Sequence, residues 1–158
     1  MNIAILTEDT YGVNFFQNLI TRLKKLGTIR NEVGIKIKRY NIYKLTNLLR
    51  VANQDYDRTI VIVDCDGSCN NGNSKEINDL INKEGTKNTI MVNLEFEIEE
   101  WICISEGMNY GPEKPSDVLK SQRKYEKFQL PIYVDKLKIE ELLDKSESFF
   151  IFIRALNK

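Results

Sequence analysis

Histidine is absent from the 158 residues of this sequence, which excludes the common forms of catalysis and metal binding that need an imidazole group. Ser–His and Cys–His catalytic pairs and His-ligated zinc sites all depend on that group. Proton transfer and metal binding must therefore fall to carboxylates, Lys, Tyr or Cys.

An excess of charge of either sign is also missing, because 23 basic residues balance 23 acidic ones. This balance excludes a strongly basic nucleic-acid coat and a long acidic tail. No apolar run approaches the roughly 18 residues of a membrane-spanning helix, so we expect no membrane span. Hydrophobic residues make up 42% of the chain, which is typical of a globular protein rather than a disordered one.

Cysteine is scarce, with three residues at positions 65, 69 and 103 and no C-x-x-C spacing. This odd number predicts free thiols in a reducing compartment rather than a disulfide framework or a zinc site. The apolar run at the N-terminus follows no basic region and therefore differs from a signal peptide. We expect a first strand there and a cytoplasmic protein.

The order of apolar patterns predicts strands alternating with helices over the first hundred residues. Four segments have the pattern of strands: 3–6, 34–40, 59–63 and 88–93. Between them lie segments with helical spacing: 13–26, 42–52 and 73–83, the last opened by a capping box of Asn73 and Glu76. Such alternation predicts an α/β fold with a mostly parallel four-stranded sheet covered on both faces.

The remaining third of the chain is predicted to be helical. Residues 94–105 fit a strand period as well as a helical stripe, and their length favours a helix that begins near Glu95. Further helices are expected at 118–128, 137–143 and 146–156, although the apolar run 149–153 also fits a buried strand. The whole chain, 1–158, is thus predicted to be one domain, with an α/β core over 1–105 and a helical C-terminal extension over 106–158.

Acidic residues follow two of the predicted strands. Glu8 and Asp9 come after the first strand, and Asp64 and Asp66 after the third. Ligands of parallel sheets collect at the carboxyl ends of the strands, and oxygen ligands suit Mg²⁺ or Mn²⁺. The alternative for Asp64 and Asp66 is an ordinary Asp-x-Asp-Gly turn. The alternative for Glu8 and Asp9 is a helix start, where acidic residues are favoured.

These motifs together resemble the Toprim domain of topoisomerases, primases and overcoming-lysogenization-defect (OLD) nucleases. The resemblance rests on Glu8, on Asp64-x-Asp66 and on the alternating frame. The segment 97–102 (Glu-Ile-Glu-Glu-Trp-Ile) is similar to the E-x-E-x-W motif of small stand-alone Toprim-like proteins, as are Lys114-Pro115, 125–127 and the closing helix. One departure is Asp9, which stands where the common Toprim pattern has Gly.

The resemblance implies a Rossmann-like Toprim fold and Mg²⁺-dependent phosphoryl transfer. Glu8 would act as general acid/base or metal ligand, and Asp64 and Asp66 would hold the ion. The third motif would add Glu99 and Glu97, although residues two apart on a helix point about 200° from each other. A solvated face is the alternative for Glu95, Glu97 and Glu100, and Trp101 is expected in the core.

The function that the resemblance implies is a nuclease that cleaves phosphodiester bonds, with a separate ATPase as partner in a defence or repair system. The chain has no P-loop motif of its own. Candidate phosphate contacts are Lys75, Lys124 and Lys127, although most surface lysines only aid solubility. With a net charge of zero, we expect weak binding to nucleic acid. Homo-oligomerisation stays open.

Two other functions compete with this interpretation. Asp64 and Asp66 also resemble the nucleophile and acid/base of a haloacid-dehalogenase-type phosphatase. That motif normally ends the first strand of its fold, whereas here it follows the third. The other alternative is a non-catalytic Toprim-fold binding module within a complex.

Overall fold

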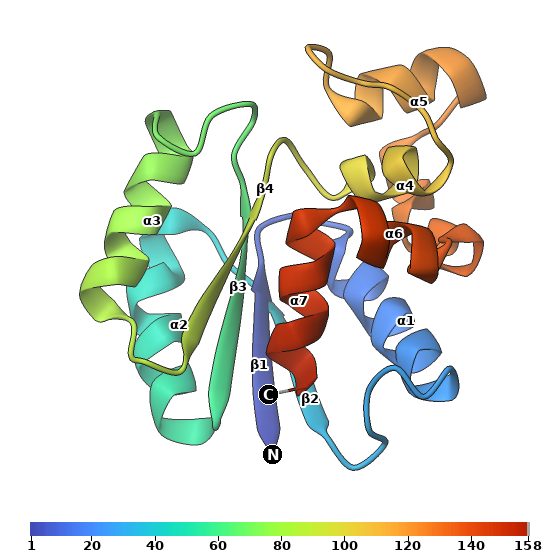
Figure 1. The fold of residues 1–158 in the computed structure, drawn as a ribbon. Coiled ribbons are helices and arrows are strands. Elements are labelled where there is room, and N and C mark those ends of the chain that lie inside the picture. Colours follow the sequence, from blue (N-terminus) through green and yellow to red (C-terminus); the bar gives the residue numbers. More distant parts are fainter. Residues whose placement is uncertain (158) are drawn as a thin grey trace.

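The computed structural model describes residues 1–157 as a four-stranded sheet with helices on both faces (Figure 1). The strands are β1 (Asn2–Thr7), β2 (Gly34–Arg39), β3 (Arg58–Asp64) and β4 (Thr89–Leu94). Their spatial order is β2-β1-β3-β4, and every pair is parallel. The predicted α/β class and parallel sheet are therefore confirmed, and β2 and β4 are the edge strands.

Helices follow each of the four strands. Those of the N-terminal part are α1 (Gly12–Lys25), α2 (Ile42–Asp55) and α3 (Gly72–Glu84). The C-terminal part contains α4 (Glu99–Ser105), α5 (Pro115–Arg123), the 3-10 helix η1 (Lys127–Lys136), α6 (Ile139–Lys145) and α7 (Glu147–Asn157). Over residues 1–157, none of these helices has the length and apolar character needed to cross a bilayer.

Two apolar cores lie on opposite faces of the sheet. Alternate residues of the strands point to opposite faces, so Ile3 and Ile5 pack with α1, α4 and α7, whereas Leu6, Val61 and Val63 pack with α2 and α3. Figure 1 shows α2 and α3 on one side of the sheet and α1 with the C-terminal helices on the other. The central strands β1 and β3 are buried on both faces, which explains their continuous apolar runs.

The direction in which the chain adds strands to the sheet reverses between β1 and β3, and this reversal indicates where a ligand would bind. From β1 the chain passes through α1 to β2 on one side, and from β2 through α2 to β3 on the other. In such sheets, ligands bind beyond the carboxyl ends of the two strands where the order reverses. A Cβ atom at Gly12 would lie 2.6 Å from Thr7 Oγ1, so glycine lets α1 begin close to the end of β1.

Two predicted helix boundaries and one predicted helix cap are wrong. The helix expected from Glu95 begins at Glu99, because the backbone of 95–97 donates to the Glu100 side chain instead of continuing a helix. The helix expected to run to Phe128 ends at Arg123 and is followed by η1. The capping box of Asn73 does not form, because α3 begins at Gly72 and Asn73 binds Glu8.

Candidate functional site

Two acidic side chains follow β1 and take part in different contacts. Glu8 Oε2 accepts a hydrogen bond from Asn73 Nδ2 of α3 at 3.1 Å. The carboxylate of Asp9 accepts the backbone N–H of Tyr11 and forms an ion pair with Lys127 at 2.8 Å. The β1–α1 loop thus directs one carboxylate toward α3 and the next toward η1.

Asp64 ends β3 at the reversal point, and its partly buried carboxyl group lies near other acidic side chains. Burial, together with the carboxylates of Asp9 and Glu8, raises the pKa of Asp64 from 3.8 to about 8, while Lys127 opposes the shift. A carboxyl group that is buried beside other carboxylates disfavours its ionised form. The structure therefore brings Glu8 and Asp64 to the same edge of the sheet, as the sequence predicted.

Asp66 lies in the loop after β3, and its carboxylate contacts a lysine. Asp66 has φ of +47° and Gly67 a φ of +95°, so the loop turns sharply. Lys114 Nζ lies 3.4 Å from Asp66 Oδ1. Asp66 borders the same hollow as Asp64, but its side chain forms an ion pair rather than joining Glu8.

The same sharp loop joins two of the cysteines. Cys65 and Cys69 form a disulfide, with their Cα atoms 4.6 Å apart. The expectation that all three cysteines are free thiols is therefore wrong for this pair, because the turn at Gly67 brings together residues that a C-x₃-C spacing alone does not. Cys103 is a free, buried thiol in the core, as predicted.

A surface hollow of about 360 Å³ lies between the loop after β3 and the first turn of α3. Asp64 and Asp66 line one side, and residues 71–74 line the other. No side chain caps α3: the side chain of its N-cap residue, Asn71, instead donates a hydrogen bond to Ser68 Oγ at 3.3 Å. Free backbone N–H groups at a helix N-terminus bind phosphate readily.

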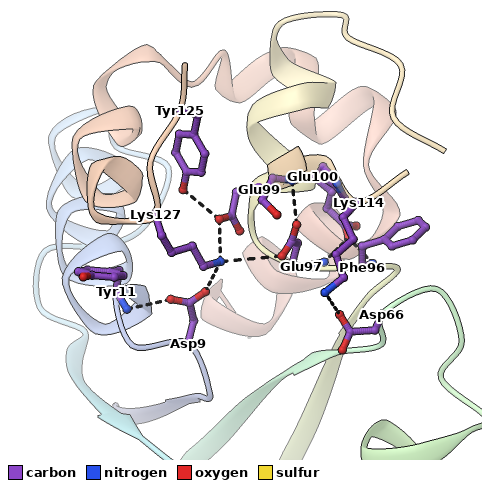
Figure 2. A network of polar contacts seen from close by, with 12 residues as sticks. Asp9, Tyr11, Asp66, Phe96, Glu97, Glu99, Glu100, Lys114, Tyr125 and Lys127 are labelled. Atoms are coloured by element: carbon purple, nitrogen blue, oxygen red, sulfur yellow. Dashed lines mark hydrogen bonds and ion pairs between the residues drawn. The ribbon is translucent and has the colours of Figure 1, made fainter. Parts of the chain in front are cut away.

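Lys127 lies at the centre of a second acidic group, which Figure 2 shows. Its Nζ atom is 2.6 Å from Glu99 Oε2, 2.8 Å from Asp9 Oδ2 and 3.9 Å from Glu97 Oε1. The pKa of Lys127 is raised: burial alone would lower it, but the carboxylates of Glu99 and Asp9 outweigh that effect. Lys127 therefore remains charged.

Glu99 is buried completely, which is unusual for a carboxylate. Its Oε2 atom accepts hydrogen bonds from Tyr125 Oη at 2.9 Å and from Lys127. Burial raises the pKa of Glu99, whereas the charge of Lys127 lowers it. The other oxygen, Oε1, is buried without a hydrogen-bond partner among the described residues.

Glu97 belongs to the same group but precedes α4. Its Oε2 atom accepts the backbone N–H of Ser116 at 2.8 Å, and its Oε1 atom faces Lys127. Within one helix, Glu97 and Glu99 would point in nearly opposite directions. Because Glu97 lies before the helix, both carboxylates of the third motif reach the same ammonium group.

The other predicted phosphate contacts lie elsewhere. Lys75 is paired with Asp79 on the exposed face of α3. Lys124 is exposed and adopts a left-handed conformation after α5. Three contacts of the site carry no local sequence signal, since each joins segments far apart in the chain: the pairing of Asp9 with Lys127, the hydrogen bond of Asn73 to Glu8 and that of Tyr125 to Glu99.

No three acidic or cysteine side chains within residues 1–157 are already arranged as ligands of one metal ion. The acids instead form two groups. Glu8 and Asp64 lie at the reversal point beside the hollow, and Asp9, Glu97 and Glu99 surround Lys127.

Glu100 organises the loop that carries Glu97. Its carboxylate accepts the backbone N–H groups of residues 95, 96 and 97, at 3.2, 2.7 and 3.1 Å. Glu100→Ala would leave these donors unpaired, so we expect a loss of about 2–4 kcal/mol in the free energy of unfolding. Urea titration followed by circular dichroism measures it, with Glu113→Ala at an exposed position as control. A loss no larger than that of the control would contradict this role.

Comparison with models of protein families, with curated proteins and with solved structures found no match to this chain.

Proposed function

We propose that the chain is a Toprim-type, Mg²⁺- or Mn²⁺-dependent phosphodiester hydrolase whose active site is the carboxyl edge of β1 and β3. The observation that carries the proposal is the hollow beside Asp64, which has carboxylates on one side and an uncapped helix N-terminus on the other. Carboxylates attract a cation and the helix N-terminus attracts a phosphate, which are the two partners in metal-assisted phosphoryl transfer.

The donor set fits a hard divalent cation in its chemistry. Glu8, Asp64 and Asp66 offer only oxygen ligands, which Mg²⁺ and Mn²⁺ prefer. The raised pKa of Asp64 reflects burial beside other acids, a condition that a bound cation would relieve. Such an ion would neutralise charge on the phosphate and stabilise the leaving oxygen.

The chain's own residues would supply the remaining steps. Glu8 would accept a proton from the attacking water, and the amide of Asn73 holds its carboxylate in place at 3.1 Å. The free N–H groups of α3 would bind the phosphate of the substrate. Lys114 is half exposed beside Asp66, where it could contact a neighbouring phosphate of nucleic acid.

Cleavage assays with Mn²⁺ test this function. Labelled single- and double-stranded DNA and RNA are incubated with the protein, with and without chelator. We expect slow, salt-sensitive cleavage that needs the metal and falls at least about 100-fold in Glu8→Gln, because the general base is lost. Glu76→Gln makes the same chemical change at an exposed position of α3 and should leave the rate unchanged.

Two results would reject the proposal. Cleavage that persists at the native rate in Glu8→Gln would show that the activity does not depend on this site. Binding of Mn²⁺ without cleavage of any of the four substrates would instead favour the non-catalytic binding module, in which a partner such as a separate ATPase supplies the activity.

A further inference from the structure

Three carboxylates from separate segments converge on the ammonium group of Lys127 (Figure 2). Asp9 comes from the loop after β1, Glu97 from the loop after β4, and Glu99 from the first turn of α4. Their side chains are 5%, 9% and 0% exposed, whereas Lys127 is 41% exposed. The carboxylates therefore form a buried cradle, and only the lysine that fills it reaches solvent.

The cradle has nearly the dimensions of a divalent-cation site. Glu99 Oε2 and Asp9 Oδ2 lie 2.6 and 2.8 Å from one point, the Nζ atom of Lys127. Mg²⁺ binds oxygen at about 2.0–2.1 Å, so each carboxylate would have to move inward by only about 0.5–0.8 Å. Glu97 at 3.9 Å is at the distance of a ligand bound through water, and Mg²⁺ retains several waters.

Glu99 provides a second, independent observation that favours a cation site in the cradle. Its Oε1 atom belongs to a completely buried carboxylate and has no hydrogen-bond partner among the described residues. A buried acceptor without a partner is costly, and a carboxylate oxygen normally accepts hydrogen bonds or binds a metal. One ammonium group also neutralises only one of the three carboxylate charges. The cradle thus has both an oxygen and negative charge that Lys127 leaves unsatisfied.

We propose that the ammonium group of Lys127 takes the place of a second divalent cation at this edge of the sheet. Asp9, Glu97 and Glu99 then form a hard-cation site that the chain fills with its own lysine, so that at most one Mg²⁺ or Mn²⁺ binds, at Glu8 and Asp64. The prediction that the native chain binds an ion at Glu8 and Asp64 rests on the proposed function. The prediction that the cradle binds a cation once Lys127 is replaced does not.

Counting bound Mn²⁺ tests the proposal directly. The electron paramagnetic resonance signal of free Mn²⁺ measures the ions bound per chain. We expect Lys127→Met, which keeps the aliphatic stem but removes the charge, to bind one ion more than the native chain. Lys120→Met, at an exposed position of α5, is the matched control and should bind no extra ion.

A second pair of variants separates this proposal from the proposed function. In a Glu8→Gln/Asp64→Asn background the first site is removed, and adding Lys127→Met should still give one bound ion. If the native chain binds no Mn²⁺ but Lys127→Met binds one, the proposed function fails and the cradle site stands. If Lys127→Met binds no more than the native chain, the cradle proposal is overturned.

Loss of the lysine leaves three buried carboxylates unpaired, so Lys127→Met could unfold without metal. In that case Mn²⁺ should restore the native circular dichroism spectrum, and failure to restore it would count against the proposal. Lys127→Arg keeps a positive charge in the cradle and should fold without metal and bind no extra ion. An extra ion in Lys127→Arg would show that the charge of the lysine does not occupy the site.

Discussion

Trp101→Ala is expected to lower the free energy of unfolding by about 3–5 kcal/mol, a large part of the stability of a domain of this size. Trp101 is completely buried, and its ring lies 5.0 Å from that of Phe149 and 6.0 Å from that of Phe16. Its Nε1 atom also donates a hydrogen bond to Ser148 Oγ at 2.9 Å. Removal of the ring would leave a cavity between α1, α4 and α7 and a hydroxyl without its donor.

Urea titration followed by far-UV circular dichroism measures this loss, since the variant lacks the chain's single Trp and its fluorescence. Tyr43→Ala removes an aromatic ring that is 92% exposed and should change the stability by less than about 0.5 kcal/mol. A small loss in Trp101→Ala would mean that α4 and α7 do not depend on this contact. The prediction of Trp101 as a core residue is confirmed by its burial.

The strands and most helices could be predicted because their signal is local. The β-branched run from Thr59 to Val63 lies in β3, and the alternation of Ile35 and Ile37 with lysines lies in the edge strand β2. Periodicity reports which side of an element is buried, and it needs no knowledge of distant segments. It also places acids at strand ends, which is how Glu8 and Asp64 were found.

The contacts within the site could not be predicted, because they depend on distant segments and on irregular backbone. Lys127 has the sequence context of a surface lysine, yet its partner Glu99 lies 28 residues away. Glu100 fits an exposed acidic run, but the chain at 95–97 turns back and uses it as an acceptor. Neither periodicity nor spacing encodes such a turn, so a solvated face stood as the alternative for Glu97 and Glu100, which are in fact buried.

Asp64→Asn is expected to stabilise the metal-free protein at alkaline pH while it removes metal-dependent activity. The pKa of Asp64 is about 8 in the folded protein and 3.8 as its ordinary value. Between these values the folded state binds more protons than the unfolded state, so the free energy of unfolding falls as the pH rises. The full cost is present above pH 8 and disappears below about pH 4.

With chelator at pH 8.5, we therefore expect Asp64→Asn to exceed the native chain in stability by several kcal/mol and at most about 6, since the shift spans about four pKa units and one unit corresponds to about 1.4 kcal/mol. At pH 4.5 the difference should shrink to a fraction of that value. Urea titration at both pH values measures it. Asp79→Asn, at an exposed site on α3, is the control and should show no such dependence on pH. An equal difference at both pH values would contradict the cause given for the shift.

Addition of Mn²⁺ should reduce the stability advantage of Asp64→Asn over the native chain at pH 8.5. Binding at 100 times the dissociation constant would stabilise the native chain by about 2.7 kcal/mol, and Asp64→Asn, which lacks the ligand, would gain little. Because Mn²⁺ must displace the proton of Asp64, its affinity for the native chain should rise about tenfold per pH unit up to pH 8. If the affinity did not change with pH, Asp64 would be buried for a structural reason and the metal would bind elsewhere. A metal-binding carboxylate is thus expected to lower the stability of the metal-free protein and to bind the ion. This combination distinguishes it from a carboxylate that is buried for a structural reason.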